Sequence, residues 1–107
     1  HVHSRASQKY SAKLELQSMN IVQRIEIPRN ITIYIWSPNG ISDGIRIING
    51  TPITTTTSWV TVNPGDLLSI RAYIDGGIGF NATISLRFIY TNNAVKAIYP
   101  ITISLKG

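Results

Sequence analysis

The sequence predicts an all-β fold: a single β-sandwich of jelly-roll or immunoglobulin-like Greek-key type, with about eight strands and an extended N-terminal arm. Apolar and polar residues alternate with a period of two along most of the chain, and no stretch sustains the i, i+3, i+4, i+7 spacing of an amphipathic helix. Turn sequences rich in glycine, proline, asparagine and aspartate separate the alternating runs. Isoleucine, a β-branched residue that favours strands, occupies 19 of the 107 positions.

Three strands are predicted in the first part of the chain. Lys9–Ser18 alternates between apolar and polar side chains, as expected of a strand with one solvated face. Asn20–Ile27 is a second strand, and Pro28 ends it because proline lacks the backbone donor that a ladder needs. Asn30–Ser37 is apolar on both faces, so we expect it in the middle of a sheet.

Turn signals divide the middle of the chain. Residues Ser37–Gly40 have the Ser-Pro-Asn-Gly sequence of a tight turn, in which proline presets φ and the last two residues tolerate positive φ. The short strand Ile45–Ile48 is closed by a hairpin turn at Asn49–Gly50. The second arm of that hairpin is predicted to run from Pro52 to Val62.

The last part of the chain contains three more predicted strands, separated by turns. These strands are Leu67–Ile74, Phe80–Tyr90 and Val95–Leu105. Phe80–Tyr90 places its apolar side chains on one face, and Pro100 is expected to break the ladder of the last strand.

The chain is long enough for one domain, predicted to comprise residues 9–107, and residues 1–8 form a polar arm without alternation. Cysteine is absent, so packing or assembly must stabilise the fold without disulfides or thiolate zinc sites. The longest apolar run is far shorter than the roughly 20 residues of a membrane-spanning helix, and no such span is predicted.

The residue inventory argues against an enzyme. Both histidines lie within the first three residues, and no cysteine is present, so no serine- or cysteine-based catalytic set is credible. Asp43, Asp66 and Asp75 lie at predicted turns, where aspartate commonly bonds to its own backbone. They form a glycosidase pair or a Ca²⁺ site only if their loops converge. We therefore predict no catalytic residues and no cofactor.

The net charge of +5 does not indicate nucleic-acid binding, because the basic residues are scattered singly from Arg5 to Lys106. Charged residues make up only 14% of the chain, compared with roughly 25% in an average soluble domain. A surface so poor in charge is expected to be covered by something neutral or apolar.

The chain begins at His1 and not at methionine, and we therefore expect that it is secreted. Three N-glycosylation sequons, at Asn30, Asn49 and Asn81, agree with an extracellular or cell-surface location and with N-linked glycans.

The N-terminus contains the residues of one candidate metal site. If His1 is the true terminus, its amine, two amide nitrogens and the imidazole of His3 form a square-planar cage suited to Cu(II) or Ni(II). Together with Tyr99–Thr102, this arrangement resembles the periplasmic copper-carrier family of small, cysteine-free β-sandwiches, whose mature chains begin with His-X-His. The resemblance implies copper binding at His1 and His3, although Tyr99 stands where that family has a copper-binding histidine.

Aromatic residues offer a second kind of binding site. Trp59 follows a run of four threonines that is predicted to be an edge strand or an O-glycosylation site, and it is the best candidate for an exposed aromatic. An exposed ring of this kind would suit a carbohydrate-binding module.

The leading interpretation is a structural subunit of an extracellular filament, a pilus or surface thread. The segment His1–Ser18 would leave its own domain and complete the sheet of a neighbouring copy by β-strand addition. Such a head-to-tail contact propagates into a polymer. A viral capsid or decoration protein, and a copper-binding or carbohydrate-binding module, are the alternatives. The side chains expected to fill the neighbour's groove are Tyr10, Ala12, Leu14 and Leu16.

Overall fold

Ten β-strands and no helix make up the part of the chain that the structure, a computed structural model, describes, namely residues 2–3 and 8–107. The described residues therefore contain no helix that could cross a membrane. The strands are β1 (Val2–His3), β2 (Tyr10–Glu26), β3 (Asn30–Ser37), β4 (Gly40–Ile41), β5 (Ile45–Ile48), β6 (Thr51–Thr54), β7 (Val60–Val62), β8 (Leu67–Asp75), β9 (Ile78–Thr91) and β10 (Lys96–Lys106).

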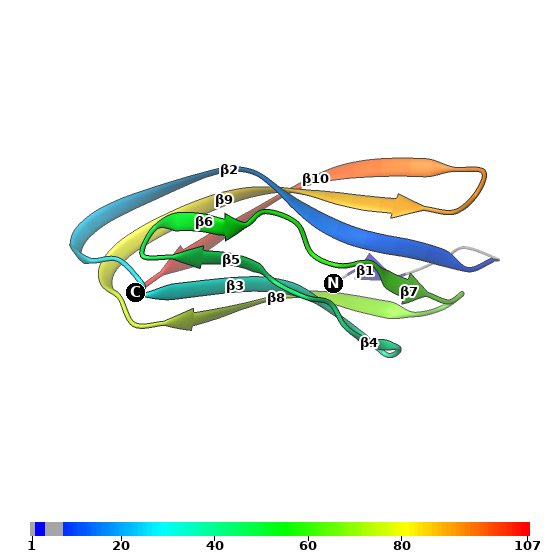
Figure 1. Cartoon of the computed structure of the whole chain (residues 1–107), viewed down its shortest axis with the longest axis horizontal. Coiled ribbons are helices and arrows are strands. Elements are labelled where there is room, and N and C mark those ends of the chain that lie inside the picture. The colour runs from blue at the N-terminus through cyan, green and yellow to red at the C-terminus, as the bar shows by residue number, and fades with distance from the viewer. Residues whose placement is uncertain (1, 4–7) are drawn as a thin grey trace.

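These strands form two antiparallel sheets that pack face to face (Figure 1). The six-strand sheet has the order β1-β8-β3-β5-β6, with β4 paired to β3, and the four-strand sheet has the order β10-β9-β2-β7. The predicted all-β, sandwich-like fold is confirmed. Its jelly-roll or immunoglobulin-like type and its N-terminal arm stay predictions.

The first two predicted strands, Lys9–Ser18 and Asn20–Ile27, are in fact one strand, β2. Its register against β9 shifts between Leu16 and Ser18 and again between Gln23 and Glu26. Each shift marks a β-bulge, where an extra residue bends the strand and changes which residues face inward. In the sequence, this change in which residues face inward resembles the end of one strand and the start of the next. The resulting long strand runs beside β9 along much of the molecule, whose longest extent is 48 Å (Figure 1).

The predicted strand from Pro52 to Val62 is also wrong, because it divides into β6 in one sheet and β7 in the other. The threonines between them cross from sheet to sheet alongside β2. There the Thr57 N–H donates to the Leu14 carbonyl at 2.9 Å, and the Leu14 N–H donates to the Thr57 hydroxyl at 2.9 Å. Thr57 is consequently buried, whereas a residue of a solvated edge strand would be exposed.

Two predicted turns are confirmed. At Ser37–Gly40, the Ser37 hydroxyl donates to the Gly40 carbonyl at 2.8 Å. At the β5–β6 hairpin, Asn49 and Gly50 have φ values of 47° and 80°, which fit the positive φ that a two-residue hairpin turn requires.

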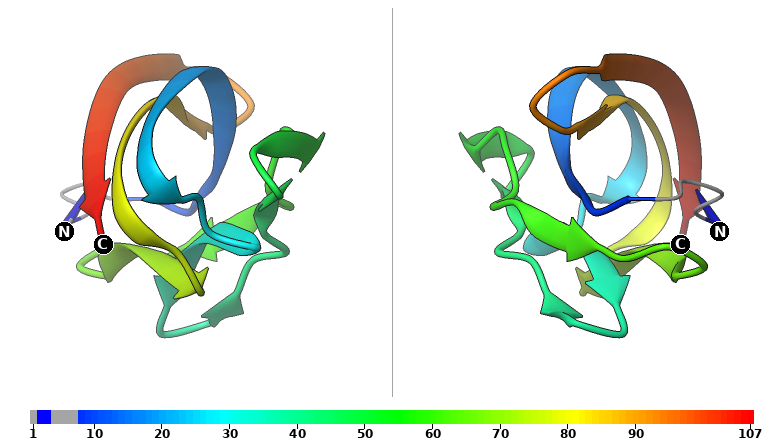
Figure 2. Two further views of the ribbon diagram at one scale, coloured as in Figure 1. Left: turned by 90° about the vertical axis from the view of Figure 1, so that its left-hand side faces the viewer. Right: turned by 90° about the vertical axis from the view of Figure 1, so that its right-hand side faces the viewer.

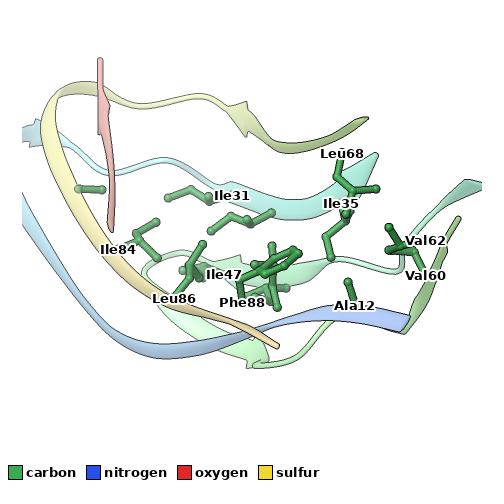
Figure 3. Close-up of a cluster of buried hydrophobic side chains, with 14 of the residues drawn as sticks. Ala12, Ile31, Ile35, Ile47, Val60, Val62, Leu68, Ile84, Leu86 and Phe88 are labelled. Atoms are coloured by element: carbon green, nitrogen blue, oxygen red, sulfur yellow. The ribbon is translucent and has the colours of Figure 1, made fainter. Parts of the chain in front are cut away.

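The core lies between the two sheets and consists almost entirely of aliphatic side chains from alternating strand positions (Figure 3). As predicted, β3 is an interior strand, and it pairs with β5 on one side and β8 on the other. The most deeply buried large side chains include Leu14, Ile31, Ile33, Ile35, Ile45, Ile47, Leu68, Ile84, Leu86 and Phe88.

Candidate functional site: open edges of the sandwich

The three turn aspartates do not converge. The Asp66 carboxylate accepts hydrogen bonds from the Asn63 N–H at 2.8 Å and from the Asn39 side chain at 2.7 Å, as a turn residue would. Asp75 pairs with Arg29 at 2.8 Å, and this hydrogen bond raises the pKa of the arginine above its ordinary value. Among the residues that the structure describes, no three histidine, aspartate or glutamate side chains come together as metal ligands would.

The predicted copper site falls largely outside the described part of the chain. His1 is not described, and for His3 the structure gives the backbone, which pairs with Leu67 of β8.

The three sequons differ in exposure. Asn49 is exposed at the β5–β6 turn, and Asn81 is exposed on the outer face of β9. Asn30 is half-buried, and its side-chain amide donates to the hydroxyl of Thr32, the third residue of its own sequon, at 3.1 Å. Glycosylation of all three stays a prediction.

Trp59 is 48% exposed, so its side chain is accessible from solvent. The Lys13 ammonium lies 4.7 Å from the centre of the ring, where a cation–π interaction covers part of one face. Trp36 has a similar partner in Arg71, at 4.8 Å. Cations on tryptophan rings were not apparent from the sequence, because the two members of each pair lie far apart in the chain.

The predicted donor residues Tyr10, Ala12, Leu14 and Leu16 lie in β2 of the chain's own sheet. Tyr10 and Ala12 pair with β7, and Ala12, Leu14 and Leu16 pair with β9. Ala12 and Leu14 are fully buried in the chain's own core, and the Tyr10 ring stacks on Tyr90 with 4.2 Å between ring centres. Their donation to a neighbouring copy stays a prediction, and in the single chain they complete the chain's own sandwich.

One side of the sandwich is bordered by two long strands, and over most of its length each of them pairs with a described strand along one edge alone. Figure 2 shows β8 and β10 on the same side, with β6 on the opposite side. The strand β10 pairs with β9, and β8 pairs with β3. On the other edge of β8, β1 pairs with Leu67 and Leu68 and leaves the stretch from Ser69 to Asp75 without a partner among the described strands.

The hydrogen bonds of β3 show which backbone groups of β8 face this open edge. The Ile35 carbonyl accepts from the Ser42 N–H and the Ile35 N–H donates to the Ser42 hydroxyl, both at 2.9 Å, so the Ile35 backbone faces away from β8. Because this direction alternates along a strand, β3 bonds to β8 through the neighbouring positions, and its partners in β8 are Ser69, Arg71 and Tyr73. The backbone groups of the residues between them, Ile70, Ala72 and Ile74, therefore face the open edge.

The side chains of the same three residues lie on the inner face of the sheet. Each stands directly opposite a buried isoleucine of β3, and residues opposite each other share a face. Ile70 and Ile74 are nevertheless only half-buried, and Ala72 is exposed. Across the gap, Tyr99 stands opposite buried Phe88 on the inner face of the other sheet and is 54% exposed. The inner faces of both edge strands are therefore incompletely covered.

The edge of β10 differs because it contains Pro100. The Gly107 and Phe80 backbones exchange two hydrogen bonds of 3.2 Å, so alternate residues of β10 counted back from Gly107 bond to β9. Pro100 belongs to the other set, which faces the open edge. The expected break in the ladder is consequently absent, and β10 stays in register with β9 from Lys96 to Lys106. Instead, because Pro100 has no backbone N–H, the row of hydrogen-bond donors along the open edge of β10 is interrupted at this residue.

A third open edge lies along the second half of β2, where β9 is the one described strand that pairs with Ser18–Glu26. Met19 and Ile21 are half-buried there. This edge ends in exposed Gln23, Arg24 and Glu26 and contains the second register shift, features that natural edge strands use against unwanted pairing.

Comparison of the chain with known protein families, with curated protein sequences and with solved structures finds no match to any of them. The resemblance to copper carriers therefore stays limited to the residues quoted for it, and function is inferred from the chain's own geometry.

Proposed function

We propose that this chain is a structural subunit that assembles with copies of itself by β-strand addition, as the subunit of an extracellular filament such as a pilus or surface thread. The observation that carries the proposal is the open side of the sandwich between β8 and β10. There, unpaired backbone groups coincide with inward-facing apolar side chains that remain partly exposed. One more strand would satisfy those backbone groups and cover those side chains.

The donor in this proposal is the N-terminal segment, residues 1–18. Among the described residues, its first strand, β1, is held by two residue pairs, Val2 with Leu68 and His3 with Leu67. Its second part, Tyr10–Leu16, contributes Ala12 and Leu14 to the core. If that part is donated, the equivalent segment of a neighbouring copy must take its place in the sheet, so the two copies exchange strands. The segment ahead of Tyr10 can be donated without removing either side chain from the core.

Head-to-tail donation of a strand joins two different surfaces of the subunit, so it repeats from copy to copy and builds a filament unless the rotation closes a ring. The low charge of the chain agrees with this role, because few charged side chains must lose water when copies pack together.

The test compares the full chain with a chain that lacks residues 1–8, at equal concentration, by electron microscopy and sedimentation. We expect filaments from the full chain and monomers from the shortened one. Deletion as far as Ser18 is not a useful comparison, because it removes Ala12 and Leu14 from the core. Thermal unfolding of the shortened chain serves as the folding control.

A full chain that remains monomeric, or a shortened chain that forms the same filaments, would overturn the proposal. Closed shells in the same images would instead support the capsid or decoration protein.

A further inference from the structure

We infer that the edge of β8 from Ser69 to Asp75, here called the acceptor edge, is the site that receives the donated strand. The occupant is the N-terminal segment of a second copy of this chain, running antiparallel to β8. This inference rests on the proposed function and identifies the surface at which two copies join.

The backbone of the acceptor edge is ready to pair. The N–H and C=O groups of Ile70, Ala72 and Ile74 point away from β3, and no described strand pairs with them. The pairing of β8 with β3 is in continuous register from Ser69 to Asp75, without a bulge that would twist the edge away. An incoming strand therefore meets an unbroken row of donors and acceptors.

The side chains of the incoming strand have a defined destination. Residues bonded opposite Ile70, Ala72 and Ile74 would point in the same direction as these side chains, into the sandwich. There they would lie over the partly covered inner face of β10, which presents Tyr99, Ile101, Ile103 and Leu105. The acceptor edge therefore suits a strand with small residues at alternate positions, and the N-terminal segment has Val2, Ser4 and Ala6 at such positions.

The pairing of β1 indicates the occupant and its direction. Val2 pairs with Leu68 and His3 with Leu67 in antiparallel register, on the same edge of β8. Leu68 lies two residues before Ile70, so its backbone faces the same edge. The acceptor edge is thus continuous with a pairing that the N-terminal segment of this chain already makes. At about 3.3 Å per residue, residues 1–8 of a second copy are long enough to span it.

The other long edges are less suitable. Pro100 interrupts the edge of β10, and charged side chains and a bulge lie at the end of the β2 edge. In the described part of the chain, the acceptor edge alone combines an uninterrupted ladder, exposed inward-facing side chains and an existing strand pairing.

The experiment uses a matched pair of proline substitutions in the full chain. Ala72→Pro removes an N–H that faces the acceptor edge, and Ser104→Pro removes one that faces the open edge of β10; both residues are exposed. Neither substitution removes a ladder bond within the chain. We expect Ala72→Pro to abolish filaments while the chain remains folded, and Ser104→Pro to assemble like the unaltered chain.

Hydrogen exchange of the unaltered chain gives a second measurement that does not depend on a variant folding. Assembly is expected to slow exchange at the Ile70, Ala72 and Ile74 amides by at least about tenfold, while Met19 and Ile21 in β2 change little.

Filaments of Ala72→Pro at normal yield would refute the acceptor edge and leave the proposed assembly intact. Slower hydrogen exchange on the β2 or β10 edge in place of the acceptor edge would refute the acceptor edge as well. If the unaltered chain does not assemble at all, the proposed function fails, and the acceptor edge fails with it.

Discussion

Thr57 lies in the segment that crosses between the sheets, and of the residues there we expect it to contribute most to the free energy of unfolding. Its hydroxyl accepts a hydrogen bond from the buried Leu14 N–H at 2.9 Å and donates one to the Ser58 carbonyl at 2.9 Å. Thr57→Val replaces the hydroxyl with a methyl group of nearly the same size. It therefore removes the acceptor for Leu14 without opening a cavity.

The expected cost follows from the burial of that N–H. A buried donor left without a partner costs about 1–3 kcal/mol, and Thr57 is only 4% exposed, so water cannot easily take the place of the hydroxyl. We expect the free energy of unfolding to fall by about 2 kcal/mol. With a urea m-value of about 1.5 kcal/mol/M for a domain of this size, the midpoint should fall by roughly 1.3 M.

Urea unfolding of the monomeric fraction, followed by circular dichroism, measures this shift. Thr55→Val is the matched control, because Thr55 belongs to the same run, is exposed, and has no side-chain hydrogen bond to the described residues. Its effect should stay within about 0.5 kcal/mol. Equal midpoints for the two variants would show that the Thr57 hydroxyl is not the partner on which Leu14 depends.

Two further predictions concern packing. Leu86→Ala opens a cavity in the core and should lower the free energy of unfolding by about 2–5 kcal/mol in the same urea assay, whereas Ile53→Ala, at an exposed position, should change it by less than about 0.5 kcal/mol. Gly77→Ala should destabilise the chain more than Gly65→Ala, because both glycines have positive φ but a Cβ at Gly77 would meet the Phe80 ring at 2.9 Å, while a Cβ at Gly65 meets nothing. Similar melting temperatures for the two glycine variants would contradict the steric part of this reasoning.

Much of the local structure follows from the sequence alone. In β3, isoleucines at alternate positions all enter the core, because successive side chains of a strand point to opposite faces. The turn at Asn49–Gly50 is equally local, since only residues that tolerate positive φ can close so short a hairpin. The alternation of Tyr10, Ala12, Leu14 and Leu16 correctly predicted a strand with one apolar face.

The tertiary structure decided which strands pair and which edges remain open. The alternation of Leu68, Ile70, Ala72 and Ile74 is the same as that of an interior strand, so the sequence did not distinguish the acceptor edge. At Gln17, the alternation of apolar and polar residues shifts by one position. A bulge within a strand and a turn between two strands both produce such a shift, so the sequence did not distinguish them. Side-chain periodicity is set by each residue's own backbone, whereas edges, bulges and the division of β6 from β7 depend on hydrogen bonds between residues far apart in the chain.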